Sequence, residues 1–215
     1  MIVVKWSIVR RRQFLRIVGM GLVAPVVLTA CDGIRTAVGL EKTTPLTQDQ
    51  YVSLSDVAPD FTLPATNGRP FHLAEYRGKV VLVVFGYTFC PDVCPLTLLK
   101  LAEARRILGA DGERVQVLMV TVDPERDQMS NLTSYVTGFD KSFIGVRGTT
   151  EETEAVVKLW GVHFERDAAS TPSGYAVAHT AGTFVVDRQG KRRLLLSPEL
   201  SGQVVASQIK LFLKG

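Results

Sequence analysis

An unbroken apolar run, Val80–Phe85, constrains the fold of this chain more than any other segment. The run is rich in valine and shows no polar alternation, which predicts a strand buried on both faces in a helix-covered sheet. Residues 115–122 form a second run of this kind. Between the two, residues 94–108 place apolar side chains at helical spacing, and Gly109 follows as a residue suited to a helix C-terminus. Strand, helix and strand in this order predict an α/β fold.

Shorter segments extend this unit on both sides. Asn67-Gly68 is a turn signal between two strand candidates, and residues 149–152 fit a capping box that begins a helix ending at Trp160. The other predicted elements are strands at 61–63, 70–73, 143–146, 175–177, 183–187 and 192–196, helices at 127–136 and 203–213, a loop at 168–174 and a helix start at Ser197-Pro198. Because the first buried strand leads into a helix that opens with two cysteines, we expect a thioredoxin-like fold with an N-terminal strand pair and an inserted strand–helix region.

The positive charge of the chain is confined to its beginning. The formal net charge is +4, but residues 1–31 hold five basic residues and no acidic one, which leaves 20 basic against 21 acidic residues in the remainder. Binding of nucleic acid requires a basic surface on the folded part of a protein. Nucleic acid is therefore not an expected partner.

Residues 1–31 are expected to be an export signal. Their apolar stretch, 17–28, would span about 18 Å as a helix, short of the ~30 Å of a bilayer core. Residues 11–16 resemble a twin-arginine signal, and residues 28–31 resemble a bacterial lipobox in which Cys31 becomes lipidated. The alternative is an uncleaved N-terminal anchor.

The remaining chain divides into an expected tether, residues 32–57, and a domain, residues 58–215. Asp32 resembles the signal that keeps some bacterial lipoproteins on the inner membrane. We therefore expect a lipid-anchored protein on the periplasmic side of a bacterial inner membrane, where the domain faces an oxidising compartment.

Cys90 and Cys94 stand where the first buried strand leads into the following helix. Their spacing places both sulfurs on one side of a helical turn, with Cα atoms about 6 Å apart, a separation that a disulfide accepts and that a small soft metal ion bridges as readily. The unpaired N–H groups at a helix start favour the thiolate, which is both nucleophile and ligand. A structural disulfide, a redox pair and a metal site all remain open for this pair.

His179 is the histidine best placed to join the cysteines. It precedes the predicted strand 183–187, on the loop that faces the cysteine helix in a thioredoxin-like fold. His72 lies in a presumed strand and is expected to be structural or exposed, and His163, which follows a helix end, is not an expected ligand. Two thiolates suit copper(I), and an imidazole adds affinity for copper(II). Zinc accepts the same ligands, but a structural zinc site normally has four protein ligands.

Three motifs together resemble the Sco (SenC) family of copper proteins, which serve the assembly of cytochrome c oxidase. They are Gly86–Pro95, Val120–Asp127 and Ala178–Thr180, within a matching region of roughly Asp60–Leu213. The resemblance implies one copper ion per chain, held by Cys90, Cys94 and His179. It also implies that the chain delivers copper to the dinuclear copper site of oxidase subunit II, or reduces the cysteines of that site.

The same resemblance places Asp123 and Asp127 near the metal loop. The alternative is that Asp127 caps the following helix and that Asp123 forms a turn with Pro124. The chain departs from the family at Gln128, where the family usually has Thr, and in its lipobox, since most members have a transmembrane anchor.

A copper chaperone is the favoured function, and a thiol–disulfide oxidoreductase is the alternative. A thioredoxin-like reductase is expected to have two residues between its cysteines and a cis-proline facing them. This chain has three, and Ala181-Gly182 occupies the stretch before Thr183 where that proline would fall. Peroxidase activity, a third reading, needs a peroxide-binding pattern around a single cysteine that the sequence does not show.

Overall fold

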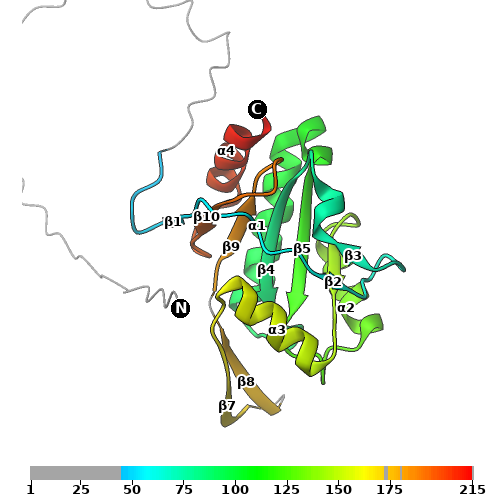
Figure 1. The fold of residues 1–215 in the computed structure, drawn as a ribbon. Helices are drawn as coiled ribbons and strands as arrows, with labels where there is room; N and C mark the ends of the chain where they lie inside the picture. Colours follow the sequence, from blue (N-terminus) through cyan, green and yellow to red (C-terminus); the bar gives the residue numbers. More distant parts are fainter. Residues whose placement is uncertain (1–44, 172–173, 180, 215) are drawn as a thin grey trace, which may run out of the picture. The chain divides into compact units, whose positions relative to one another are not determined.

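The computed structural model describes residues 45–171, 174–179 and 181–214, with side chains left undescribed for 166–176 and 178–179. Within these residues a six-stranded sheet has the order β1-β10-β9-β4-β5-β6 (Figure 1). Its strands are β1 (Tyr51–Ser53), β4 (Val80–Gly86), β5 (Val115–Thr121), β6 (Ile144–Val146), β9 (Thr183–Val186) and β10 (Arg192–Leu196). Two hairpins stand outside this sheet, β2 (Thr62–Leu63) with β3 (Phe71–His72) and β7 (Phe164–Thr171) with β8 (Gly174–His179).

Helices cover both faces of the sheet (Figure 1). The helices are α1 (Val93–Leu108), α2 (Met129–Phe139), α3 (Thr150–Trp160) and α4 (Gly202–Leu213), with short 3-10 turns η1 (Leu73–Tyr76) and η2 (Gly109–Arg114). One apolar cluster joins α1, α2 and α4 to one face, and a second joins α3 and the β2–β3 hairpin to the other. Each cluster takes alternate residues of β4, which is why this strand has no polar position.

The central strands confirm the predicted α/β fold. Strands β4 and β5 pair in parallel and are buried at every residue, while β9 pairs with the other side of β4 in the antiparallel direction. The predicted strand pair near the domain start is present as β2 and β3, and the inserted region is present as β6 and α3. The fold is thioredoxin-like, as expected.

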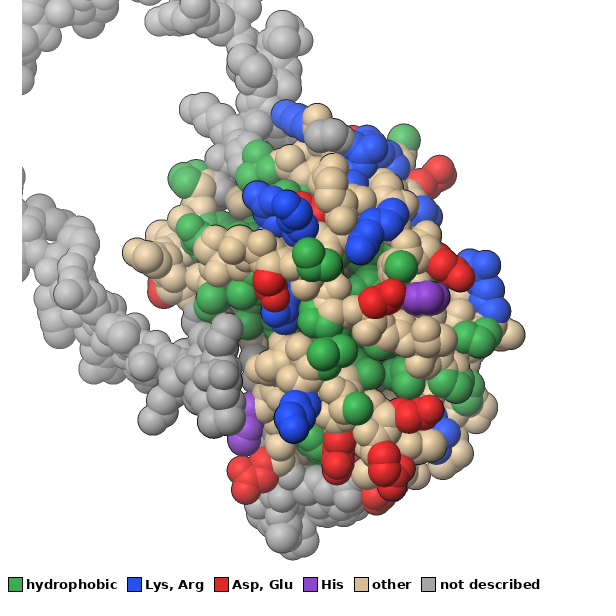
Figure 2. Space-filling model, in the orientation of Figure 1, with side chains coloured by type: hydrophobic (Ala, Val, Ile, Leu, Met, Phe, Trp, Pro, Cys, Tyr) green, Lys and Arg blue, Asp and Glu red, His purple; other side chains and the backbone are tan. Residues whose placement is uncertain are grey.

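Helix α3 begins with the predicted capping box. The Thr149 hydroxyl accepts a hydrogen bond from the Glu152 amide at 3.2 Å, and the Glu152 carboxylate accepts one from the Thr149 amide at 2.8 Å. Figure 2 shows acidic side chains gathered over this part of the surface. Glu151 and Glu152 lie in the first turn, where their negative charge stabilises the positive end of the helix dipole.

Three predicted boundaries are corrected by the structure. Strand β1 pairs with β10, so part of the expected tether 32–57 belongs to the sheet. The expected loop 168–174 is largely strand, because β7 ends only at Thr171 and β8 begins at Gly174. Strand β7 was missed because its sequence is polar and lacks the apolar alternation that predicts a strand.

The third correction concerns the closing helix. Ser197-Pro198 forms a turn in which the Leu200 amide donates to the Ser197 carbonyl at 3.4 Å. Helix α4 instead begins at Gly202, where the Ser201 hydroxyl accepts from the Val204 amide at 3.3 Å. No helix in the described part of the chain has the length and apolar character needed to cross a bilayer. The expected export signal and Cys31 lie outside the described residues.

Candidate metal centre

Cys90 and Cys94 lie together at the junction of β4 and α1. Cys94 is the second residue of α1 and is 2% exposed, whereas Cys90 lies in the preceding loop and is partly exposed. The prediction that both share a helical turn is wrong for Cys90, because the helix begins only at Val93. Both cysteines are reduced thiols, and their side chains are hydrogen-bonded to each other.

The Cys94 thiol is buried beside the partly exposed Cys90. Its hydrogen bond with Cys90, followed by burial, raises the pKa of the Cys94 thiol, while a weaker backbone hydrogen bond from Tyr87 acts in the opposite direction. The expectation that the helix start favours a thiolate is therefore wrong for Cys94 in the metal-free chain. A soft cation bound to both sulfurs would deprotonate them and offset their burial, so this donor set fits copper(I).

The end of β4 leaves room for the Cys94 sulfur only because residue 86 is glycine. A Cβ atom at Gly86 would lie 2.9 Å from Cys94 Sγ and 3.4 Å from the end of Met119. Cβ atoms essentially never approach a neighbour at 2.9 Å, so any side chain here must displace the thiol. The close approach of backbone and sulfur thus fixes Cys94 against the sheet.

Gly86→Ala is expected to lower the free energy of unfolding by about 1–3 kcal/mol, the usual cost of overpacking a tight core site. Urea unfolding of the metal-free chain measures this change. The matched control is Gly138→Ala in α2, where a Cβ meets nothing within 4 Å. Because alanine is the better helix former, the control should gain about 0.5–1 kcal/mol. Equal stability of the two variants would contradict the tight packing of Cys94.

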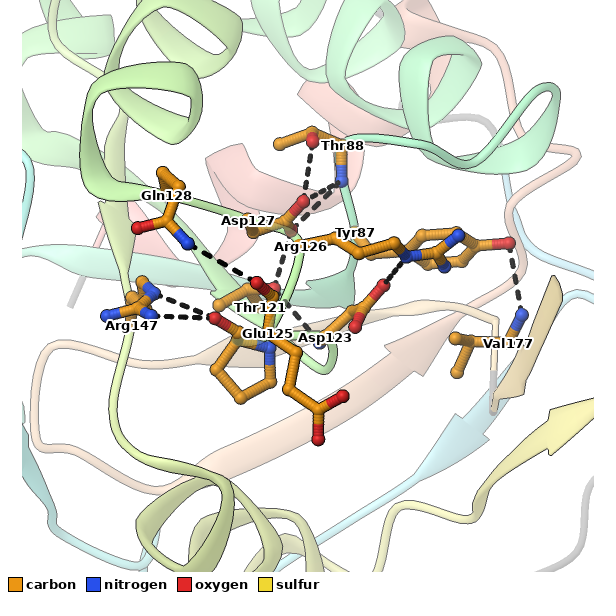
Figure 3. Close-up of polar contacts among 11 residues, drawn as sticks. Tyr87, Thr88, Thr121, Asp123, Glu125, Arg126, Asp127, Gln128, Arg147 and Val177 are labelled. Carbon is orange, nitrogen blue, oxygen red and sulfur yellow. Dashed lines mark hydrogen bonds and ion pairs between the residues drawn. The ribbon is translucent and has the colours of Figure 1, made fainter. Parts of the chain in front are cut away.

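Asp127 ties the cysteine loop to the segment that follows β5 (Figure 3). Its carboxylate is 0% exposed and accepts hydrogen bonds from the Thr88 amide at 3.0 Å, from the Thr88 hydroxyl and from the Thr121 hydroxyl at 2.6 Å. Burial is the main reason why the pKa of Asp127 is raised. The alternative reading is wrong for Asp127, because Gln128 is the N-cap residue of α2. Its other half is confirmed, since the Asp127 amide donates to the Asp123 carbonyl at 3.0 Å and closes a turn that contains Pro124.

Asp123 and Arg126 form an ion pair beside the aromatic residues of the cysteine loop. Asp123 is completely buried and accepts a hydrogen bond from Arg126 Nε. The Arg126 guanidinium carbon lies 5.6 Å from the centre of the Tyr87 ring and 5.1 Å from that of Phe89. Both rings flank the Thr88 contact to Asp127, so this acidic motif holds the loop at several points.

Tyr87 also reaches the β7–β8 hairpin. Its phenol oxygen accepts a hydrogen bond from the Val177 amide at 3.2 Å (Figure 3). His179 ends β8 and its backbone pairs with Phe164, but its side chain lies outside the described part. Among the described side chains, no third Cys, His, Asp or Glu forms a metal-ligand cluster with the cysteines. His179 thus stays a predicted ligand.

The other two histidines each lie near an acidic side chain. His72 Nε2 lies 2.8 Å from the Asp60 carboxylate, which also accepts from the Phe61 amide. His163 is exposed and its ring nitrogen lies 3.9 Å from the Glu165 carboxylate. The position of His72 agrees with the expectation that it is structural or exposed.

Several residues that shape the site were not singled out from the sequence. Tyr87 and Thr88 were quoted only as part of the cysteine motif, and Arg126 only as part of the acidic motif. Thr121 also belongs to that motif, whereas Arg147, which donates two hydrogen bonds to the Pro124 carbonyl at 3.0 and 2.7 Å, lies outside the motifs. The sequence signal for these residues was a hydroxyl or guanidinium group in or near each motif. Such a group does not reveal its hydrogen-bond partner, because the partner can lie in a distant part of the chain.

A thiol pair at a strand–helix junction, in a sheet covered by helices on both faces, defines a thioredoxin-like protein. The chain belongs to the SCO1/SenC family, whose model matches residues 49–214. The resemblance noted from the three motifs is thereby confirmed.

Known relatives agree with this assignment. The mouse (Mus musculus) protein SCO2 homolog, mitochondrial, is 34% identical over 133 residues, which are 61% of this chain and 52% of that protein. The chain thus spans about half the length of this curated relative.

Two solved structures share both fold and sequence. The structure of Bradyrhizobium japonicum ScoI with copper bound is 29% identical, with a TM-score of 0.67, and the match covers 73% of this chain and 99% of that one. Apo Sco1 from Thermus thermophilus is 38% identical, with a TM-score of 0.65, and the match covers 75% and 94%.

Proposed function

We propose that this chain is a copper chaperone that binds one copper ion and delivers it to the dinuclear copper site of cytochrome c oxidase subunit II. The main support is the pair of reduced thiols, Cys90 and the buried Cys94, which are hydrogen-bonded to each other. The chain is also related to a Sco protein whose structure has copper bound. His179 is the proposed third ligand. Two thiolates hold copper(I), and the imidazole adds affinity for copper(II).

Asp123 and Asp127 are proposed to support this site without binding the metal. Their contacts go to Arg126, Thr88 and Thr121. These contacts hold the loop that carries Cys90, so the ligands are positioned before copper arrives. Such preorganisation by surrounding side chains commonly changes metal affinity by about 10- to 100-fold.

The proposed location is the periplasmic side of a bacterial inner membrane, with a lipid on Cys31 as anchor. The support is the lipobox-like sequence and the basic, apolar character of residues 1–31. An oxidising compartment would also explain why reduction of Cys90 and Cys94 must precede copper loading.

The alternative function is reduction of the subunit II copper-site cysteines. In this reaction the Cys90 and Cys94 thiols would give two electrons and two protons to the partner's disulfide. The products would be two partner thiols and a Cys90–Cys94 disulfide. The closeness of two reduced thiols favours this alternative as well.

Copper titration of the reduced full-length chain, followed by mixing with an isolated subunit II copper domain, tests the proposal. We expect one copper ion per chain, strong thiolate-to-metal absorption with copper(II), and appearance of the copper on the partner. Failure to bind copper would contradict the proposal. Reduction of the partner's disulfide by metal-free chain, with no copper transfer, would favour the alternative.

A further inference from the structure

We propose that Tyr87 is a positioning residue that fastens the β7–β8 hairpin, and with it His179, to the cysteine loop. This role rests on the proposed copper ligands. Tyr87 would not bind the metal but would set the position of His179 relative to Cys90 and Cys94. Tyr87 is three residues before Cys90, and its phenol oxygen accepts the Val177 amide hydrogen at 3.2 Å (Figure 3). His179 is two residues beyond Val177, about 7 Å along the strand.

The Tyr87 side chain is held rigidly at its own end of this contact. It is 4% exposed, and the Arg126 guanidinium lies 5.6 Å from its ring centre. Arg126 is in turn bonded to the buried Asp123. The backbone of Tyr87 also forms a hydrogen bond with the Cys94 sulfur. One residue therefore contacts a thiol through its backbone and the histidine-bearing strand through its side chain.

The hairpin needs such an attachment because it is not part of the central sheet. Strands β7 and β8 pair only with each other in the described residues. The Val177 amide donates its hydrogen bond to Tyr87 instead of to a neighbouring strand. The Val177 side chain is 5% exposed and belongs to the same core cluster as Tyr87. A buried N–H that loses its partner costs free energy, so the hydrogen bond opposes separation of the hairpin from the loop.

This arrangement predicts different effects on the two oxidation states of copper. The thiolates, which dominate binding of copper(I), lie on the β4–α1 side of the contact. The imidazole, which matters most for copper(II), lies on the hairpin side. Loosening the contact should therefore weaken copper(II) binding and leave copper(I) binding unchanged.

Tyr87→Phe in the full-length chain is the test, because phenylalanine keeps the ring and loses only the acceptor oxygen. Loss of one net hydrogen bond predicts about fivefold weaker copper(II) binding and about fivefold faster hydrogen exchange of the β8 amides in metal-free chain. The matched control is Tyr76→Phe, a tyrosine stacked on Phe71 in the same core cluster. It should change neither quantity.

A double-mutant cycle with His179→Ala separates this proposal from the proposed ligand set. If Tyr87 acts through His179, Tyr87→Phe will not weaken copper(II) binding further once His179 is alanine. A persistent effect, or unchanged copper(II) affinity and unchanged exchange in Tyr87→Phe alone, would overturn the role of Tyr87. An unchanged copper(II) spectrum in His179→Ala would instead remove the histidine ligand, and with it the copper role of Tyr87.

Discussion

Cys90→Ser is expected to weaken copper(I) binding by at least about 100- to 1,000-fold. This range is based on structural zinc sites, whose binding free energy of about 10–16 kcal/mol is shared by four ligands. Each ligand then contributes about 2.5–4 kcal/mol, which corresponds to this change in affinity. A two-thiolate site has fewer ligands to share the loss, and a serine hydroxyl is a hard and poor ligand for copper(I). Competition with a copper(I) chelator of known affinity measures the change. A decrease of less than tenfold would contradict a site built on this thiol.

Cys94→Ser should lose copper to the same extent but should also lose stability. Cys94 is 2% exposed and its sulfur lies close to Gly86, so a serine there must bury a more polar hydroxyl in a site fitted to sulfur. The expected cost is about 1–3 kcal/mol in the free energy of unfolding. Cys90 is partly exposed, so its replacement should cost little. Urea unfolding without copper separates loss of a ligand from loss of the fold.

Cys31→Ser is the matched control for both variants. Cys31 belongs to the proposed lipid anchor, so copper stoichiometry and affinity should match those of the unaltered chain. The same variant tests the anchor, because it should leave the membrane fraction when cells are fractionated. Loss of copper binding in Cys31→Ser would place the third cysteine in the metal site, and retention in the membrane would contradict the lipid anchor.

The central sheet could be predicted because its signal is local. Val80–Phe85 and residues 115–122 carry no polar position, and burial on both faces is the only stable outcome for such strands. The capping box at Thr149 is equally local, since both of its hydrogen bonds join residues three apart. The polar strand β7 had no such signal. It is held to β8 by hydrogen bonds between backbone groups, which every residue type can form, so its side chains did not predict a strand.

The sequence indicated candidate ligands for the site but not the residues that hold the surrounding loop in place. Thiol spacing and residue type indicate chemistry directly, whereas the partner of Asp127 depends on how two loops meet. Asp127 and Thr88 are 39 residues apart, and Tyr87 and Val177 are 90 apart. The helix-start argument for Cys94 failed for the same reason, because burial and a second thiol depend on tertiary packing.

Asp127→Ala should produce the largest loss of stability among these variants, about 3 kcal/mol or more. The carboxylate is completely buried, and its removal leaves the Thr88 amide and the Thr88 and Thr121 hydroxyls without their acceptor. The matched control is Asp111→Ala, an exposed carboxylate 3.1 Å from Arg114. A surface ion pair of this kind contributes about 0–1 kcal/mol. Urea unfolding of the metal-free chain compares them.

Asp127→Asn then tests whether the charge of this residue matters. Because burial raises the pKa of Asp127, the folded chain binds a proton that the unfolded chain releases at pH values just above the ordinary value of 3.8. Through that window the stability contributed by Asp127 falls as pH rises, since the unfolded state holds fewer protons. Asparagine has no such titration. The stability advantage of the unaltered chain over Asp127→Asn should therefore shrink with rising pH.

The opposite trend would also be informative. An advantage that grows as pH rises would mean that hydrogen bonds from Thr88 and Thr121 outweigh burial and lower the pKa of Asp127. The loop that carries Cys90 would then be held by a carboxylate ion. If copper(I) affinity falls in Asp127→Ala but not in Asp111→Ala, Asp127 contributes to the metal site, as expected if its hydrogen bonds to Thr88 and Thr121 hold the loop that carries Cys90.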